Sequence, residues 1–513
     1  MTTSPPDLAV LLARLRTDDT GPDREDAPVA VPWAAASATV RFPDSEEAPV
    51  DVPRTLDESR AAGRALRDRV PRRTQGALLL PERDPVAIIE EQNRDRLQDL
   101  VPLRIGRMLE SPFAFYRGTA ATMAHDLRDG PRTGVHVVAC GDAHVSNFGL
   151  FASPERRVLF DLNDFDEASD APWEWDVKRL AASMHVGGRD KGMSEEQCRE
   201  AARGAARGYR EALAAAYDRS ALDRYAFHVD AELIEPLLLK EGRLELKRTL
   251  KKARRRTSEQ VVQKITALSA DGRTRIVDQP PVTQHVDTAS LDELTTLFEA
   301  YREPLRADAR LLLSQFTVVD FVLRVVGVGS VGTRCYIVLL EGPAGEPLVL
   351  QVKEATRSVL ATYGGMVDAL PSGLVPAGSV PAQGRRVVAA QRILQAQSDP
   401  FLGWTTVEAP DRTGRPRVDF FWRQFRDMKG SVELDRLSAA QFVRYGELCG
   451  RVLARAHSQS PGTRVAHGYL GRSDAFDDAI ARWSCAYADV VEQDFAALEA
   501  AVASGRLPAE RGT

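Results

Sequence analysis

The order of four short segments constrains the fold of this chain more than any other feature. Two come early: Gly-Asp-Ala-His-Val-Ser-Asn at 141–147 and Asn-Asp-Phe-Asp at 163–166. Two come late: Gly-Val-Gly-Ser-Val-Gly at 327–332 and the strand-like run Leu-Val-Leu-Gln-Val-Lys at 348–353. Acidic and amide side chains bind cations, whereas glycine-rich loops and lysines bind phosphates. If the four segments form one site, the fold must join parts of the chain that are far apart in sequence.

Asp142 and Asn147 are candidates for catalytic and metal-binding roles. They are five positions apart, the Asp-x-x-x-x-Asn spacing of a phosphoryl-transfer loop, and follow a buried strand expected at 135–139. Asp142 would orient the attacking hydroxyl and Asn147 would bind Mg²⁺. A plain turn is the alternative, because Gly, Asp and Asn are common turn residues. His144 is either a substrate or metal contact or a hydrogen-bonded structural histidine.

Three acidic residues lie within six positions around the end of the strand expected at 157–162. Asp164 has the position of a metal-binding Asp that follows a strand. Carboxylates this close together are costly unless a cation or solvent compensates them. The pattern predicts a magnesium site with Asp164 as first ligand, Asp166 as second and Asp161 as third. A solvated acidic loop is the alternative.

The glycine-rich segment fits G-x-G-x-x-G, a pattern found in both dinucleotide-binding and kinase-type loops. Residues 334–340 after it are rich in β-branched and aromatic side chains, which favours a strand over a helix. The segment is therefore predicted to be a phosphate-covering hairpin, with a plain glycine hairpin as the alternative. Its candidate nucleotide-binding residues are Gly327, Gly329, Ser330 and Gly332.

Lys353 ends the strand expected at 347–352. A lysine within such a strand needs a partner or water for its head group, and a nucleotide phosphate would serve. An edge-strand position is the alternative. Asp176 precedes a helix expected at 176–185 and is predicted to brace the catalytic loop, although it could simply cap that helix.

Five parts are expected along the chain: a partly flexible extension at 1–75, a helical part with the catalytic loop at 76–225, a helical connection at 226–315, a β-rich lobe at 316–430 and closing helices at 431–513. The expected helices are 7–16, 56–67, 86–100, 104–109, 113–127, 176–185, 194–217, 291–298, 385–397, 439–457 and 475–502. The strands of the β-rich lobe are expected at 316–326, 334–340, 347–352, 405–408 and 417–425. A loop is expected at 278–285. The basic run at 247–256 favours a solvated helix face over a docking site for an anionic substrate.

Composition bounds the class of protein. A chain of 513 residues is long enough for two or more domains. Its net charge of -5 gives no case for nucleic-acid binding. The five cysteines form no CxxC pair, which favours a reducing compartment, and no apolar run or leader is long enough to predict a membrane span or signal peptide. A cytoplasmic location is expected.

Several segments together resemble a bacterial family labelled domain of unknown function 2252. The likeness extends from about residue 80 to 505 and rests on 111–118, 141–149, 163–167, 173–180, 326–333 and 351–355. More loosely, residues 141–147 resemble the His-Gly-Asp-x-His-x-x-Asn loop of aminoglycoside phosphotransferases, with Cys140 in place of the first histidine. Residues 453–457 resemble the helix that normally precedes that loop.

The second resemblance implies a protein-kinase-like, two-lobed α+β fold with its segments circularly permuted and with extra helical segments. It implies ATP and Mg²⁺ as cofactors. Two departures stand out. The helix at 385–397 contains Gln391 and Gln395 but no glutamate to pair with the lysine, and Asp166 replaces the glycine of Asp-Phe-Gly. Glu354 should point away from Lys353, since neighbouring strand residues face opposite sides.

The leading hypothesis is Mg²⁺-dependent transfer of the ATP γ-phosphoryl group to a hydroxyl of a small molecule. Nucleotidyl transfer to a protein on the same fold is one alternative. A non-catalytic nucleotide-binding module is the second, favoured by the missing glutamate. A metal-dependent phosphoesterase that uses Asp142, His144, Asp164 and Asp166 is the third.

Overall fold

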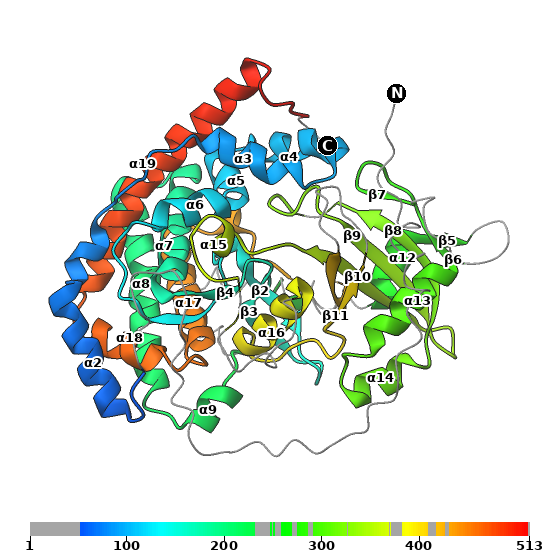
Figure 1. The fold of residues 1–513 in the computed structure, drawn as a ribbon, viewed down its shortest axis with the longest axis horizontal. Coiled ribbons are helices and arrows are strands. Elements are labelled where there is room, and N and C mark those ends of the chain that lie inside the picture. Colours follow the sequence, from blue (N-terminus) through cyan, green and yellow to red (C-terminus); the bar gives the residue numbers. More distant parts are fainter. Residues whose placement is uncertain are drawn as a thin grey trace.

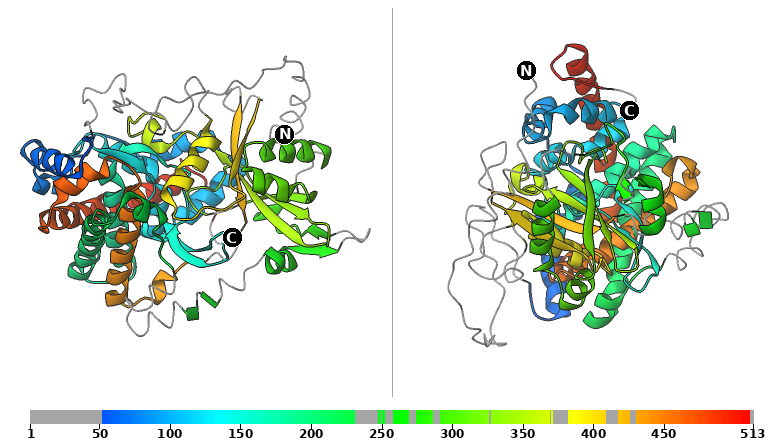
Figure 2. Two further views of the ribbon diagram at one scale, coloured as in Figure 1. Left: turned by 90° about the horizontal axis from the view of Figure 1, so that it is seen from below. Right: turned by 90° about the vertical axis from the view of Figure 1, so that its right-hand side faces the viewer.

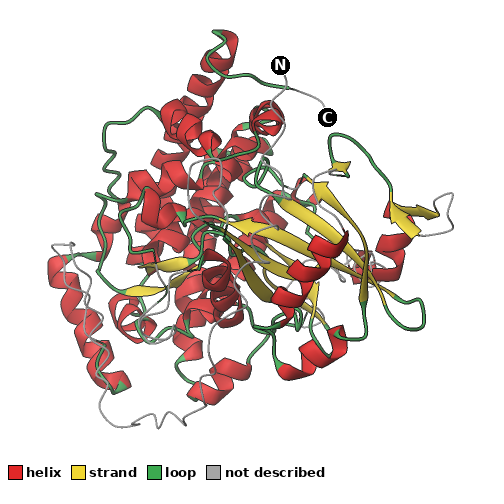
Figure 3. Ribbon diagram, turned by 45° about the vertical axis from the view of Figure 1, so that its right-hand side comes forward, coloured by secondary structure: helices red, strands yellow, loops and turns green. Residues whose placement is uncertain are grey.

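The computed structural model of the chain describes residues 52–230, 247–248, 250–251, 258–268, 274–285, 291–325, 327–368, 370, 382–408, 417–425 and 430–510. The fold is mixed α+β, as predicted, with most helices on one side and a large antiparallel sheet on the other (Figures 1 and 3). The helix expected at 7–16 and residues 249 and 252–256 of the basic run lie outside the described residues. Over the part of the chain that is described, no helix is both long and apolar enough to cross a membrane.

The helical side is built from both ends of the chain (Figure 1). Its early helices are α2 (Leu56–Arg69), α3 (Pro85–Arg94), α4 (Val101–Met108), α5 (Pro112–Gly118), α6 (Ala120–Leu127), α7 (Trp173–Asp190) and α8 (Glu195–Ala216). Its late helices are α17 (Ala439–His457), α18 (Thr463–Leu470) and α19 (Ala475–Ala503). The helix expected at 113–127 is in fact two, since the helical backbone is interrupted at Thr119, which has φ -118° and ψ 40°.

Helices α7, α8 and α17 form the centre of this side. Two glycines allow α8 and α17 to approach closely: a Cβ at Gly208 would lie 2.3 Å from the Glu447 carbonyl, and one at Gly450 would lie 2.1 Å from that of Ala205. On α7, Trp173 is fully buried and stacks on Tyr209 of α8 with ring centroids 5.7 Å apart. The packing joins segments from opposite ends of the chain into one core.

Two short strand pairs carry the early polar segments. Strand β1 (His136–Ala139) pairs antiparallel with β4 (Ser169–Pro172), and β2 (Phe148–Ala152) pairs antiparallel with β3 (Val158–Leu162). Strands β1 and β3 were expected, whereas β2 and β4 are short and were not. A 3₁₀ turn at Val145–Asn147 leads into β2, so residues 140–147 connect the two pairs. Residues 163–168 cross back from β3 to β4.

The large sheet has six strands in the order β11-β12-β10-β9-β8-β7. Five match the expected strands: β8 (Thr317–Arg324), β9 (Cys335–Glu341), β10 (Pro347–Ala355), β11 (Gly403–Val407) and β12 (Val418–Gln424). The sixth, β7 (Thr283–Gln284), pairs with β8 within a stretch expected to be a loop. The adjacent prolines at 280–281 masked this two-residue strand in the sequence pattern. The glycine-rich segment connects β8 and β9, as predicted.

Helices cover both faces of this sheet (Figure 2). On one face pack α13 (Leu291–Arg302) and α14 (Ala307–Leu313), where Tyr301 stacks on Trp422 at 4.3 Å. On the other face lies α12 (Ser258–Ile265), beside the hairpin of β5 (Thr266–Leu268) and β6 (Thr274–Ile276). The stretch 226–315 is therefore not a purely helical connection, because part of it extends and covers the sheet.

Three shorter helices complete the described chain: α9 (Ala221–Ala226), α15 (Val359–Thr362) and α16 (Gln383–Leu394). Helix α16, expected at 385–397, lies between the large sheet and the helical side (Figure 1). Its Arg386 donates to the Asp166 carbonyl at 2.8 Å, while Arg455 of α17 donates to the carbonyl of Leu394 at 2.8 Å. This helix therefore links the sheet to the segments that carry the polar loops.

Candidate functional site

The loop at 140–147 is held in place by its backbone. The N–H groups of Cys140 and Gly141 donate to the two oxygens of the buried Asp176 carboxylate at 2.5 and 2.9 Å. His457, at the end of α17, contacts the same carboxylate at 3.0 Å. The predicted bracing role of Asp176 is thereby confirmed. Gly141 has φ +80°, and a Cβ there would lie 2.2 Å from the Glu167 carbonyl, so only glycine fits between the two polar segments.

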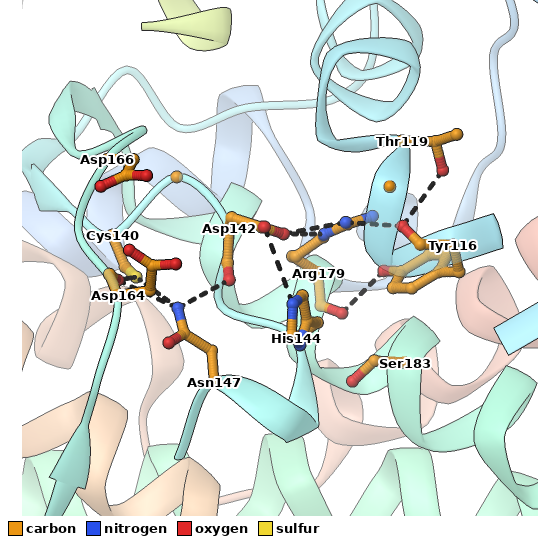
Figure 4. Close-up of polar contacts among 12 residues, drawn as sticks. Tyr116, Thr119, Cys140, Asp142, His144, Asn147, Asp164, Asp166, Arg179 and Ser183 are labelled. Atoms are coloured by element: carbon orange, nitrogen blue, oxygen red, sulfur yellow. Dashed lines mark hydrogen bonds and ion pairs between the residues drawn. The ribbon is translucent and has the colours of Figure 1, made fainter. Parts of the chain in front are cut away.

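The Asp142 carboxylate lies between the Arg179 guanidinium and the His144 ring (Figure 4). Its Oδ1 accepts from Arg179 Nε at 2.9 Å and Nη2 at 2.8 Å, and its Oδ2 is 3.7 Å from His144 Nε2. Burial lowers the pKa of His144 to about 4, so the ring is neutral at pH 7. The His144 Nδ1 atom is buried and has no hydrogen-bond partner among the described residues. The pairing with Arg179 fixes the direction in which the Asp142 carboxylate points.

Asn147 joins the two early polar segments. Its Nδ2 donates to the backbone carbonyls of Asp142 at 3.1 Å and Asp164 at 3.0 Å (Figure 4). The N–H of Asn163 in turn donates to the Asn147 carbonyl at 2.9 Å. Because the amide nitrogen is used in these bonds, the Oδ1 atom of Asn147 is the end that can accept a cation.

Lys353 pairs with the acidic segment. It lies on β10, the third strand of the expected lobe, with a side chain only 3% exposed, and its Nζ contacts the Asp166 carboxylate and lies 3.9 Å from Asp164 Oδ2. Burial opposes the charged lysine, but Asp164 and Asp166 outweigh burial and raise its pKa. Burial, together with the charge of Asp164, raises the pKa of Asp166 above its usual range. Lys353 is therefore a buried cation whose partners come from a segment nearly two hundred positions earlier.

No carboxylate on α16 takes part in this pairing. Glu354 points to the opposite side of the strand from Lys353, as expected, and pairs with Arg334 at 3.1 Å. In place of a glutamate, α16 presents Arg386, which donates to backbone carbonyls of Asp166, Ala168 and Thr356. Asp166 thus occupies the role of lysine partner that the sequence left unassigned.

The N-terminal helices hold the glycine-rich segment. Arg107 of α4 donates to the Gly327 carbonyl at 2.6 Å, Arg96 donates to the carbonyl of Val331 at 2.6 Å, and the Leu97 N–H donates to that of Gly332 at 2.7 Å. Gly327 and Gly332 have φ of +71° and +87°. A Cβ at Gly329 would lie 3.4 Å from the Arg117 carbonyl, which shows how closely α5 approaches the loop.

A cavity of about 670 Å³ lies between the helical side and the large sheet. Its lining contains most of the predicted site residues: Asp142, His144, Asn147, Asp164, Gly327, Gly329, Ser330 and Lys353. Asp166 lines a smaller adjoining cavity that shares Asp142, Asp164, Gly329 and Ser330 with the larger one. Gly332 lines neither cavity. A Cβ there would lie 3.0 Å from the Arg96 side chain, so the glycine allows the loop to pass close to Arg96.

Asp161 does not join this arrangement. Its carboxylate accepts the N–H groups of Leu162 and Ala396, both at 2.8 Å, and its side chain is buried outside the cavity lining. The third place in the predicted metal set is therefore wrong, since Asp161 fastens β3 to the end of α16. The sequence pattern could have indicated this outcome. Asp161 lies within β3, where the strand fixes the direction of its side chain, whereas Asp164 and Asp166 lie in the loop that follows.

Three arginines of this region were not predicted from the sequence. Arg117 and Arg423 line the cavity, and Arg179 contacts Asp142 from outside the lining. Arg179 lies on α7 and holds Asp142, whereas Arg423 of β12 donates to Gln351 at 2.9 Å and to the Asn163 carbonyl at 3.2 Å. Arg117 lines both cavities. Arg117 and Arg179 had a sequence signal, since they lie in the segments 111–118 and 173–180 that carry the family resemblance. Tertiary contacts alone bring Arg423 to the site.

Comparison with known proteins identifies a family. Over residues 96–501, well over half of the chain, the sequence matches the family model described as "Uncharacterized protein conserved in bacteria (DUF2252)". Neither the comparison with curated proteins nor the one with solved structures found a match. The resemblance to this bacterial family is confirmed, while the looser likeness to phosphotransferases has no support from relatives.

Proposed function

This chain belongs to the uncharacterized bacterial family DUF2252, and we propose that it is a Mg²⁺-dependent phosphotransferase that uses ATP. One observation carries the proposal. Two sets of residues that are far apart in sequence, Asp142 to Asp164 and Gly327 to Lys353, line one cavity of about 670 Å³. Each set has the residue types that one half of a phosphoryl-transfer site requires.

The acceptor side of the proposed reaction centres on Asp142. This carboxylate faces the cavity with 24% of its side chain exposed and pairs with Arg179. It would accept the proton of an acceptor hydroxyl as that oxygen bonds to the γ-phosphorus of ATP. The bond from this phosphorus to the bridging oxygen breaks, and the products are ADP and a phosphate monoester. His144, neutral at pH 7, is available as a hydrogen-bonding contact to the acceptor.

The donor set fits a magnesium ion. Asp166 Oδ1 is buried without a hydrogen-bond partner among the described residues, and the Asp164 side chain is 46% exposed toward the cavity. With the Asn147 amide oxygen they form an all-oxygen set, which Mg²⁺ prefers. A bound Mg²⁺ would offset the negative charge of the nucleotide phosphates. Asp166 would then serve both the cation and Lys353.

The proposed phosphate-binding side is supported by the position of Lys353. This lysine lies on β10, the third strand counted from β8, and the glycine-rich segment joins β8 to β9. This is the placement of the phosphate-binding lysine in kinases. The absence of a glutamate on α16 is offset by Asp166, which gives the lysine an anionic partner. Backbone N–H groups of residues 327–332 are suited to donating hydrogen bonds to phosphate oxygens.

Circular permutation is supported by the end of α17. The Val138 N–H at β1 donates to Ser460 Oγ at 2.9 Å, and a Cβ at Gly462 would lie 2.3 Å from the His136 carbonyl. The helix at 439–457 thus ends beside the strand that enters the catalytic loop. In an unpermuted kinase chain, that helix would lead directly into that loop. In this chain the helix and the loop are far apart in sequence and meet only through these packing contacts.

The test is product analysis with purified full-length chain, Mg²⁺ and γ-labelled ATP over a set of small hydroxyl compounds. We expect label on an acceptor together with ADP. Release of pyrophosphate with AMP attached to a protein would replace the proposal with nucleotidyl transfer. Hydrolysis of phosphate esters without any nucleotide binding would favour the phosphoesterase, and nucleotide binding without turnover would favour the non-catalytic module.

A further inference from the structure

Arg117 lies between the two halves of the candidate site. It is the penultimate residue of α5, and its side chain lines both the larger cavity and the smaller adjoining one. The lining of the smaller cavity includes Asp142 and Asp164 from the early segments and Gly329 and Ser330 from the glycine-rich segment. An arginine in this position faces the space between the residue that would orient the acceptor and the loop that would cover the phosphates.

Its backbone is fixed to both halves. Arg179 donates to the Tyr116 carbonyl at 2.8 Å with the guanidinium that also binds Asp142, and it stacks over the Tyr116 ring at 4.0 Å. On the other side, the Arg117 carbonyl lies against Gly329. The Arg117 backbone is therefore preorganised relative to the catalytic carboxylate and the glycine-rich segment, which limits the cost of ordering the side chain around a ligand.

Arg117 differs from the neighbouring arginines in what its side chain binds. The others each donate to fixed protein groups: Arg96 to the Val331 carbonyl, Arg104 to Asn93 and Gly118, Arg107 to the carbonyl of Gly327, and Arg179 to Asp142. Among the described residues, no hydrogen bond or ion pair joins the Arg117 side chain to a protein group. Its Nε atom is buried and unpaired, as are those of Arg96 and Arg104, but these two arginines donate through their Nη atoms. Leaving a charged donor unsatisfied is costly, so the site is suited to an anion that supplies the missing acceptor.

We propose that Arg117 binds the phosphoryl group during its transfer from ATP to the acceptor oxygen. The inference rests on the proposed function. As the bond to the bridging oxygen of ATP breaks and the bond to the acceptor forms, negative charge is spread over the three outer oxygens of the moving group. A guanidinium supplied by α5 stabilises that charge more than the charge of bound ATP. Arg117 is then a catalytic residue contributed by α5, one of the early helices of the helical side.

Binding measurements with the full-length chain test this assignment without knowledge of the acceptor. The probes are ATP with Mg²⁺, ADP with Mg²⁺, and ADP with Mg²⁺ and aluminium fluoride, which mimics the phosphoryl group in transit. In Arg117→Ala we expect the ATP dissociation constant to change less than about threefold and the fluoride complex to weaken at least about 100-fold, the size typical of losing one preorganised donor. Arg117→Lys should be intermediate, since lysine keeps the charge but not the planar fork.

Arg94→Ala is the matched control, because Arg94 is an exposed arginine on α3, outside both cavity linings. Both affinities should be unchanged in it. Unaltered ATP binding and thermal unfolding in Arg117→Ala would exclude a folding defect. Equal weakening of ATP and of the fluoride complex, no weakening of either, or wild-type binding of ADP that fluoride does not tighten would each overturn the role of Arg117. A wild-type chain that binds no nucleotide would instead overturn the proposed function itself.

Discussion

Asp142 combines two properties that a hydroxyl-orienting carboxylate needs: access to the cavity and a fixed direction. Arg179, 3% exposed, supplies the fixed direction by holding one carboxylate oxygen and leaving the other toward His144. We expect Asp142→Asn to lower phosphoryl transfer by about 10²–10⁴-fold, the range typical of losing a general base, and to change ATP affinity little. Initial rates and equilibrium binding measured on the same preparation would separate the two effects.

The matched control for that variant is Asp170→Asn. Like Asp142, Asp170 is a carboxylate beside a histidine, 3.2 Å from His136 Nδ1, but it is buried outside the cavity lining. Both substitutions alter a carboxylate that contacts a histidine, so a loss of stability is expected in both variants. A comparable loss of transfer in Asp170→Asn would show that destabilisation, rather than chemistry, explains the result for Asp142.

His144 makes the stability of the fold depend on pH in a defined direction. The folded pKa is about 4, below the unfolded value of about 6.5, so the unfolded chain binds the proton more readily and stability falls as pH falls from 6.5 toward 4. In His144→Gln this contribution is absent. Between pH 7 and pH 5 the wild type should lose up to about 2 kcal/mol more than the variant in its free energy of unfolding. Denaturant unfolding at the two pH values measures this, and equal losses would contradict the buried neutral histidine.

At the scale of elements, the contact between residues 140–147 and 163–168 holds the early half of the site together. Gly141→Ala should cost about 1–2 kcal/mol for its positive φ and about 1–3 kcal/mol more for the clash with the Glu167 carbonyl. Gly192→Ala isolates the first cost, because Gly192 has φ +71° and nothing within 4 Å of an added Cβ. Denaturant unfolding compares the two variants. Equal destabilisation would mean that the two segments are not in contact.

Elements with a strong local pattern could be predicted from the sequence. The helix at 439–457 was predicted at its observed bounds, since it has a capping box at Ser438 and a continuous apolar face. The five expected strands are all present, as β-branched and aromatic runs indicate. Strands β2, β4 and β7 were not predicted. Gly149 lies within β2, Asp170 and Pro172 lie within β4, and these residue types are depleted in strands, while β7 has only two residues.

The candidate site could be predicted only where its residues are close together in sequence. The spacing of Asp142, Asn147 and Asp164 is local, and these residues do line one cavity. The pairing of Lys353 with Asp166 and the position of Arg423 depend on tertiary packing, which a single sequence does not show. Arg117 and Arg179 lie in segments that carry the family resemblance, but that resemblance assigns them no role. The prediction of Asp161 as a metal ligand was wrong because residues close in sequence need not face the same site. The side chain of Asp161 is turned away from the cavity and accepts the N–H of Ala396.

At the scale of the whole molecule, the two halves of the site come from different sides of the fold. Residues 140–166 belong to the helical side and residues 317–355 to the large sheet, with α16 and the N-terminal helices connecting them (Figure 1). Nucleotide binding at this boundary should therefore need both sides at once. Losing a group from either side should remove the same ligand-induced stabilisation, rather than two independent parts of it.

The most direct test is the stabilisation of the folded chain by ATP, with and without Mg²⁺, in wild type, Lys353→Ala, Asp164→Ala and the control Lys178→Ala. Lys178 is also a buried lysine, but it lies over Trp483 on the helical side, outside the cavity lining. At about 100 times its dissociation constant, ATP should add about 2.7 kcal/mol to wild type and to the control in the presence of Mg²⁺. We predict that this gain is lost in both site variants. A gain retained in either variant, or absent from folded wild type over a wide range of ATP concentration, would contradict a shared nucleotide site.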